Sequence, residues 1–140
     1  MKQYVTGALI DAEPEDVWAV LTNGAAYTHW NPEIVAVDGV MERGARITAH
    51  VRLGNGAVRR VPQRVLAFDA PHHMEWVGGM PFGLFVGRRV FTVTAVNGGT
   101  DFRMELFMSG PFAEMILKSV GDRQPEIDRF SAGLKRFAER

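Results

Sequence analysis

The chain has 140 residues, of which 46% are hydrophobic and 23% charged, and these values are ordinary for one globular domain rather than for a disordered or fibrous chain. Sixteen basic residues balance sixteen acidic ones without a run of like charge, which argues against a surface for nucleic acid or anionic membranes. Cysteine is absent, so disulfides and thiolate sites are excluded. The chain has no apolar run long enough to span a bilayer, and its first residues do not resemble a signal peptide. We therefore expect a cytoplasmic protein with no integral membrane association.

The first part of the chain predicts a strand followed by two short helices. Residues 3–11 alternate weakly in polarity and are expected to form the strand. Pro14 suits the first turn of a helix, which Asn23-Gly24 then ends. A second short helix is expected over 25–30, because the residue before Pro32 is disfavoured in helical geometry.

The middle of the chain predicts a series of antiparallel strands separated by turn residues. Gly54-Asn55-Gly56 and Asn97-Gly98-Gly99 are typical of hairpin turns. The expected strands are 38–41, 45–53, 57–68, 74–77, 84–96 and 100–109. The pair His72-His73 begins one of them, where adjacent side chains face opposite sides of the sheet, so we expect no metal site there.

After Gly110-Pro111 the apolar period becomes that of a helix, and we expect one long C-terminal helix that Pro125, with Gly121 four residues earlier, kinks or interrupts. Its apolar stripe steps by three, four and seven residues and comprises Ile116, Val120, Ile127, Phe130, Leu134 and Phe137. Arg123 is the only polar residue in register with that stripe. Either it projects inward and anchors an acidic ligand group, or the kink turns it to solvent.

This order of elements predicts an α+β fold in which residues 1–140 form a single domain. A curved antiparallel sheet is expected to wrap around the long C-terminal helix, with the two short helices after the first strand. Such an arrangement leaves a concave space between sheet and helix, and spaces of this kind are where small ligands bind.

Several local patterns, in the same order, resemble the SRPBCC superfamily, the helix-grip domains related to START lipid-binding proteins, pollen allergens and polyketide cyclases. The segments that carry the resemblance are 12–18, 27–32, 44–47, 74–76, 87–91, 99–100 and 109–111. The resemblance implies the helix-grip fold and an internal cavity. Its relatives include hydrophobic-ligand carriers, hormone receptors, cyclases, dehydratases and chaperone activators. One departure is Arg89, which stands where many relatives have a histidine.

We predict a ligand site on the inner face of the sheet and the facing helix. Its residues are Trp30, Trp76, Arg89, Phe91, Met104, Leu106, Arg123 and Ile127. Arg89 either holds a ligand oxygen, pairs with a buried acid such as Glu105, or reaches solvent at the mouth of the barrel. His29 is a candidate general base, although the sequence shows no acid to orient it. The catalytic residues stay unassigned, and no cofactor or metal is expected.

Three functions remain open at this point. The first is binding of a small hydrophobic molecule with a carbonyl or acidic end. The second is a polyketide cyclase or dehydratase that uses Arg89, Arg123 or His29. The third is a protein-interaction module resembling chaperone activators, in which the loop from Met80 to Phe85 meets a partner. A homodimer is also left open.

Overall fold

The computed structural model describes residues 1–140. Its elements, in chain order, are β1 (Lys2–Ile10), α1 (Pro14–Thr22), the 3-10 helix η1 (Gly24–His29), β2 (Ile34–Asp38), β3 (Arg46–Arg52), β4 (Val58–Asp69), β5 (His73–Gly79), the short 3-10 helix η2 (Pro81–Gly83), β6 (Val86–Val96), β7 (Gly99–Ser109), α2 (Ala113–Val120) and α3 (Gln124–Ala138). None of these helices is both long and apolar enough to cross a membrane.

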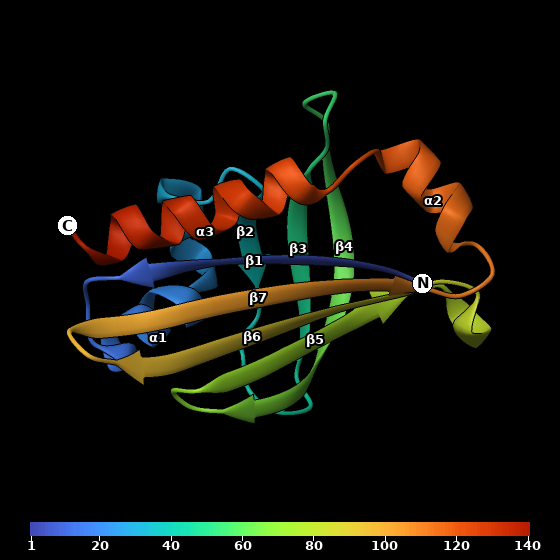
Figure 1. Ribbon diagram of the computed structural model, residues 1–140. Coiled ribbons are helices and arrows are strands. Elements are labelled where there is room, and N and C mark those ends of the chain that lie inside the picture. The colour runs from blue at the N-terminus through green and yellow to red at the C-terminus, as the bar shows by residue number, and fades with distance from the viewer.

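All seven strands form one antiparallel sheet in the order β1-β7-β6-β5-β4-β3-β2. The sheet curls so that β2, β3 and β4 lie behind α3 while β1 and β7 run along below it (Figure 1). Register shifts in β2 and β4 contribute to this curvature, because an extra residue in one strand bends it. The predicted α+β architecture, a curved sheet around the C-terminal helix, is confirmed.

The sheet is incomplete at one place, between the first half of β4 and the end of β5. Pairing of these strands stops at Arg64 opposite Val77, so residues 58–63 of β4 pair with β3 alone. Pro62 lies in this stretch. Proline has no backbone N–H, but on the unpaired side of β4 there is no strand to accept a hydrogen bond from it, so no hydrogen bond of the sheet is lost. The sheet therefore has an opening beside the Gly79–Phe85 loop.

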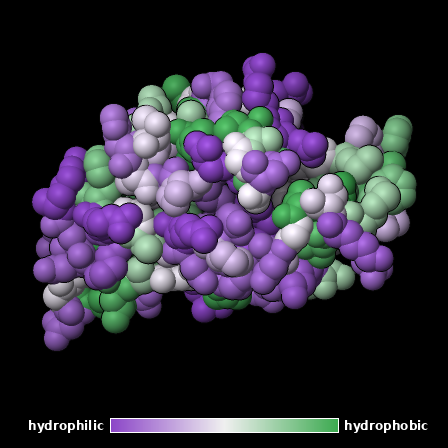
Figure 2. All heavy atoms as spheres, turned by 90° about the horizontal axis from the view of Figure 1, so that it is seen from above, coloured by the Kyte–Doolittle hydropathy of each residue, from purple (hydrophilic) through white to green (hydrophobic).

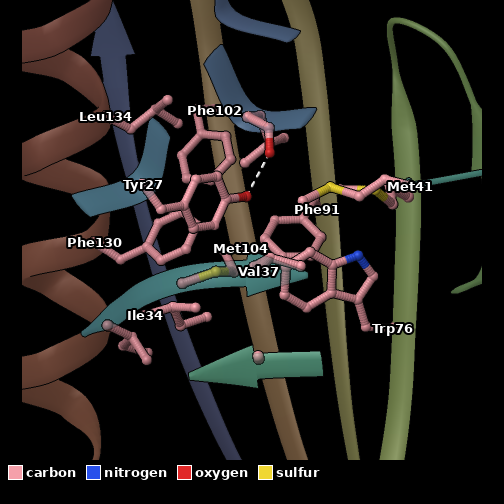
Figure 3. Packing of buried hydrophobic residues seen from close by; sticks show 14 of the residues in the cluster. Tyr27, Ile34, Val37, Met41, Trp76, Phe91, Phe102, Met104, Phe130 and Leu134 are labelled. Carbon is pink, nitrogen blue, oxygen red and sulfur yellow. Dashed lines mark hydrogen bonds between the residues drawn. The ribbon is translucent and has the colours of Figure 1, made fainter. Parts of the chain in front are cut away.

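The core lies between the inner face of the sheet and α3, with Phe130 of α3 at its centre (Figure 3). The Phe130 ring stacks on Phe102 with centroids 6.2 Å apart and meets Trp30 edge-on at 5.3 Å. Phe91 lies 6.0 Å from it on the next strand. Burial of large aromatic side chains of this kind is a major source of stability, so α3 is fixed firmly to this half of the sheet.

Two elements differ from the sequence prediction. The strand expected at 38–41 is instead β2 (Ile34–Asp38), because Gly39 has a φ of +101° and ends the strand. The long C-terminal helix is two helices, since Gly121 takes a φ of +79° before Pro125 restarts the helix in the first turn of α3. The interruption itself was predicted from these two residues.

Candidate functional site

A cavity of about 310 Å³ lies between the inner face of the sheet and α2. Its volume is at the lower end of the range found for small-molecule sites. Its apolar wall includes Val51, Leu53, Phe85, Leu106, Ile116 and Val120. It lies beside the opening in the sheet, because Pro62 and Gln63 of β4 and Met80 of the adjoining loop also line it.

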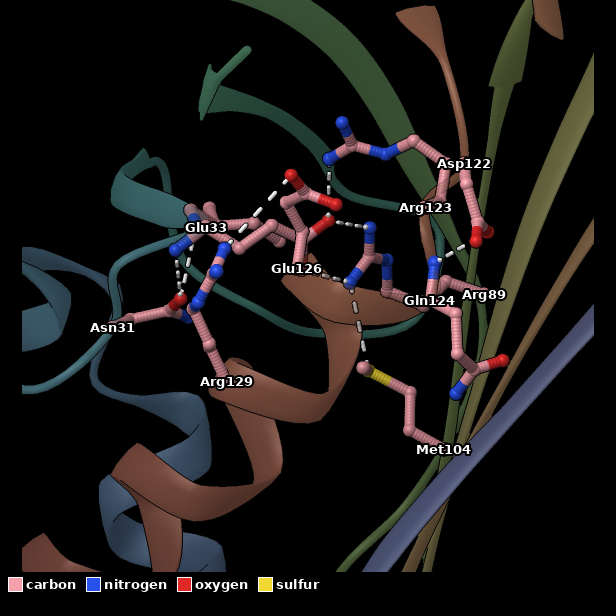
Figure 4. Close-up of polar contacts among 10 residues, drawn as sticks. Asn31, Glu33, Arg89, Met104, Asp122, Arg123, Gln124, Glu126 and Arg129 are labelled. Carbon is pink, nitrogen blue, oxygen red and sulfur yellow. Dashed lines mark hydrogen bonds and ion pairs between the residues drawn. The ribbon is translucent and has the colours of Figure 1, made fainter. Parts of the chain in front are cut away.

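One end of the cavity is formed by a buried ion cluster of Glu33, Arg89 and Arg123 (Figure 4). Arg89 donates two hydrogen bonds to the Glu33 carboxylate, Nη1 to Oε1 at 2.9 Å and Nη2 to Oε2 at 2.8 Å. Arg123 Nη2 donates to Oε2 of the same carboxylate at 3.1 Å. The exposed fractions of the side chains are 0% for Glu33, 11% for Arg89 and 6% for Arg123.

Three distant segments position this cluster. The Asn31 side-chain oxygen accepts hydrogen bonds from the backbone N–H of Glu33 and Ile34, which fixes the turn that leads into β2. Arg89 lies on β6, where its guanidinium also lies 5.9 Å from the ring centroid of Phe130. Arg123 is the residue at the break between α2 and α3. The helix interruption thus places an arginine at the cavity.

The pKa values in the cluster follow from mutual pairing within a buried site. Burial alone would raise the pKa of Glu33, but Arg89 and then Arg123 lower it below its ordinary value. Burial alone would lower the pKa of Arg89, but the Glu33 carboxylate raises it above its ordinary value. Glu33 and Arg89 are consequently both charged at neutral pH.

The cluster carries more positive than negative charge, since two guanidinium groups face one carboxylate. Arg123 is the less fully bonded of the two, because its Nη1 is buried and has no hydrogen-bond partner. Glu33 is the only acidic residue among those that line the cavity, and the exposed residues Arg59 and Arg60 also line it. A buried donor without a partner is costly, so this end of the cavity favours a ligand with an anionic or carbonyl oxygen.

Of the residues predicted to bind a ligand, the structure brings Arg89, Leu106 and Arg123 to the cavity. Arg123 points inward, so the alternative that the kink turns it to solvent is wrong. Arg89 pairs with a buried acid, but that acid is Glu33 and not Glu105. Arg89 therefore forms an ion pair and also lines the cavity wall.

The other five predicted ligand residues do not line this cavity. Trp76, Phe91, Met104 and Ile127 are at most 1% exposed and pack in the core (Figure 3), and Trp30 lines a different groove near the end of α3. The physical reason is that α3 and Phe130 fill the inner face of the sheet at that level. Alternation along a strand indicates which side chains face inward, but not how far the helix extends over them.

Glu33 was not identified from the sequence. It follows Asn31-Pro32 in a segment to which the sequence assigns no element, and its partners are 56 and 90 residues away. One signal was present, because two arginines predicted to face inward need a buried acid to compensate them. The sequence did not identify which acid it was.

The remaining candidates lie away from the cavity. His29 is exposed and lines the groove near the end of α3, and no histidine is among the residues that line the cavity. The Gly79–Phe85 loop, in contrast, is exposed as expected for a contact loop. Its Phe82 is 98% exposed with a φ of +61°, and Met80 is 38% exposed.

Taken together, the fold and the cavity define a class of protein, an α+β helix-grip domain with a cavity between a curled sheet and its C-terminal helices. Residues 1–140 match the family described as polyketide cyclase/dehydrase and lipid transport. The chain belongs to this family, whose fold binds small molecules. The description covers both enzymes and lipid carriers, so membership leaves chemistry and binding open.

Solved structures agree on the fold. The chain is similar to protein MLL2253 from Mesorhizobium loti, with a TM-score of 0.73, 21% identity and coverage of 96% of this chain and 95% of that one. It is similar to a START superfamily protein from Mycobacterium smegmatis, with a TM-score of 0.72, 13% identity and coverage of 98% and 97%. A third similar structure is the di-domain ARO/CYC BexL from the BE-7585A biosynthetic pathway, with a TM-score of 0.73, 14% identity and coverage of 99% of this chain and 50% of that one. No curated protein matches the chain. At these identities the likeness concerns the fold alone.

Proposed function

We propose that residues 1–140 act as a single domain that binds a small, largely apolar molecule with a carbonyl or acidic end. The apolar part lies against Leu106, Ile116 and Val120, and the polar end accepts a hydrogen bond from Arg123. The observation that carries this proposal is the buried, unpaired Nη1 of Arg123 in the wall of a cavity whose other walls include Leu106, Ile116 and Val120. A ligand oxygen would supply the partner that this donor lacks.

A matched pair of fluorescent probes tests the polar end separately from the apolar one. Anilinonaphthalenesulfonate and N-phenylnaphthylamine share their ring system, but only the first carries an anionic group. We expect Arg123→Gln to weaken binding of the sulfonate about tenfold or more, because a hydrogen bond to a charged group contributes roughly 1.5–3 kcal/mol. Binding of the neutral amine should change little.

The control variant is Arg103→Gln, since Arg103 is exposed on β7 and does not line the cavity. It should bind both probes as the unmodified protein does. Equal loss of both probes in Arg123→Gln would indicate a damaged fold, and equal retention of both would refute the role of Arg123. Native mass spectrometry of the purified protein gives independent evidence, because a retained apolar acid or ketone would appear as an added mass.

The alternative of a cyclase or dehydratase is supported by some of the residues that it requires but not by all of them. Arg89 and Arg123 both line the cavity, which supports a role in polarising a carbonyl of a bound molecule. The proton acceptor is less well provided, because His29 lies outside the cavity and the carboxylate of Glu33 is paired with both arginines. A carboxylate with a lowered pKa is a weak base. This comparison supports binding over cyclisation or dehydration.

A further inference from the structure

A second hollow, of about 510 Å³, lies between η1, the segment leading into β2 and the end of α3. We name it the basic groove and define it by Thr28, His29, Asn31, Arg52, Arg136 and Arg140, with Trp30, Pro32, Val35, Gly133 and Phe137 completing its walls. No aspartate or glutamate lines it. The basic groove and the internal cavity share no lining residue, and they lie towards opposite ends of α3.

The three arginines of the basic groove are exposed and take part in none of the ion pairs of the structure. They come from two elements, since Arg52 ends β3 while Arg136 and Arg140 lie at and beyond the end of α3. Arg140 is held in place, with its guanidinium carbon 3.6 Å from the ring centroid of Phe137. In a chain of zero net charge, three unpaired arginines without an acid in one hollow are a local excess of positive charge.

A structural role for these cations explains only part of the arrangement. Basic residues at the C-terminal end of a helix complement its dipole, and Arg140 Nη1 donates to the carbonyl of Phe137 at 2.6 Å. This accounts for Arg136 and Arg140. Arg52 has only a long contact with its own hairpin, from Nη1 to the carbonyl of Gly56 at 3.5 Å, and this contact does not explain why it lines the same hollow as the two arginines of α3 and the exposed His29.

Asn31 provides a second, independent observation. Its side chain is buried at 3% exposure and lines the basic groove, and its Oδ1 is occupied by two backbone donors. Its Nδ2 is buried and has no partner. Guanidinium groups line the same hollow as this unsatisfied amide donor. A ligand with several oxygens would accept hydrogen bonds from both kinds of donor.

We infer that the basic groove binds the phosphate group of a small molecule, at a site separate from the internal cavity. Guanidinium groups suit phosphate because their paired N–H groups match two of its oxygens. More than one cation faces the site, which fits the roughly two negative charges that a phosphate monoester carries at neutral pH. The hollow is larger than a phosphate, so its apolar walls leave room for the group that bears it.

The test is a titration of the isotope-labelled protein with inorganic phosphate and pyrophosphate, followed by backbone amide NMR shifts. Chloride keeps the ionic strength constant, because exposed charges are screened by salt. We expect saturable shifts in residues 28–35 and 133–140 and none at Leu106 or Ile116 of the internal cavity. The double variant Arg52→Gln/Arg136→Gln should lose about tenfold or more in affinity, since it removes two charged donors.

Arg43→Gln is the matched control, because Arg43 is exposed on the turn before β3 and lines neither hollow. It should bind phosphate unchanged. Single variants at Arg52 and Arg136, with their melting curves, show that a loss of binding is not a loss of fold. The absence of saturable shifts, or equal affinity of the double variant, would overturn the proposal.

A second arm identifies the source of the phosphate. Vesicles of phosphatidylcholine with phosphatidic acid are sedimented with the protein and with the double variant. Sedimentation that depends on the two arginines, with saturable shifts, supports a lipid headgroup. Saturable phosphate shifts without sedimentation support a free phosphate compound. Sedimentation that the double variant retains, without phosphate shifts, contradicts a phosphate site in the groove.

Discussion

Glu33 is the residue on which the buried charges of the cavity depend. Its carboxylate is the only ion-pair partner of both Arg89 and Arg123. Removing it would leave two guanidinium groups in a site where they are almost completely shielded from water. The energetic cost of a buried ion is several kcal/mol unless it is paired, so this one side chain controls both stability and the positive character of the site.

We predict that Glu33→Gln lowers the free energy of unfolding by about 3–5 kcal/mol, the loss that follows when one partner of a buried ion pair is removed. Urea unfolding followed by circular dichroism measures it. The control is Glu105→Gln, whose carboxylate pairs with the exposed Arg103 at 3.6 Å and should cost less than about 1 kcal/mol. Similar losses for the two variants would contradict the central role of the cluster.

The lowered pKa of Glu33 also predicts how stability depends on pH. Burial opposes ionisation of Glu33, but Arg89 and Arg123 outweigh it, so its pKa in the folded protein is below that in the unfolded chain, about 4.3. Its contribution is therefore complete above about pH 4.3 and is lost as the pH falls through the folded pKa. The free energy of unfolding of Glu33→Gln should accordingly fall less steeply, as the pH is lowered, than that of the unmodified protein. Part of the slope remains, because the pKa of Glu75 is also lowered. If the unfolding free energies of the variant and the unmodified protein fell in parallel with pH, the prediction would be wrong.

Among the elements, α2 is the one placed to cover the cavity. Ala113 is its only buried residue, while Ile116 and Val120 line the cavity. Glycines with positive φ precede and follow it, Gly110 at +98° and Gly121 at +79°. A helix of eight residues with so little burial has small local stability of its own.

We expect amide hydrogens of α2 to exchange faster than those of α3, and to be protected when anilinonaphthalenesulfonate occupies the cavity. The physical reason is that a ligand adds apolar contacts to Ile116 and Val120, which are otherwise only partly covered. Hydrogen-exchange mass spectrometry measures both effects, and α1 serves as the internal control because it lies away from the cavity. Exchange in α2 as slow as in α3 without ligand would show that it is a fixed wall.

The elements also show what sequence patterns could predict. Turn glycines and alternation located β3, β4, β6 and β7, and the Gly121-Pro125 spacing predicted the helix break. The register of the apolar stripe singled out Arg123 but left open whether it faces inward. These features depend on neighbours within a few residues. The acid opposite Arg89 and the extent of α3 over the sheet depend on contacts between distant segments. For this reason Glu33 was missed, and Trp76 and Phe91 were placed in the pocket instead of the core.

At the scale of the whole molecule, apolar residues are exposed at the end that bears α2, as well as over the middle of the same face (Figure 2). Phe82 and Met115 are 98% and 57% exposed there, close to the opening in the sheet. An exposed apolar surface of this kind is consistent with a ligand entrance to the cavity or with a contact to a protein partner. The hypothesis of a protein-interaction module therefore remains open to test. It is also a place where an apolar probe could adsorb without entering the cavity.

Ligand binding in the cavity should stabilise the entire fold, because its walls come from β3, β4, β6, β7, α2 and the break before α3. At a free anilinonaphthalenesulfonate concentration 100 times the dissociation constant, we expect about 2.7 kcal/mol of added unfolding free energy. Chemical unfolding followed by circular dichroism measures it. Phe82→Ser should keep this gain, since its ring is outside the cavity. Arg123→Gln should lose about half of it or more at the same probe concentration, because a tenfold weaker affinity leaves about 1.4 kcal/mol. If Phe82→Ser abolished the gain instead, the probe would be binding the exposed surface, and the cavity would not be its site.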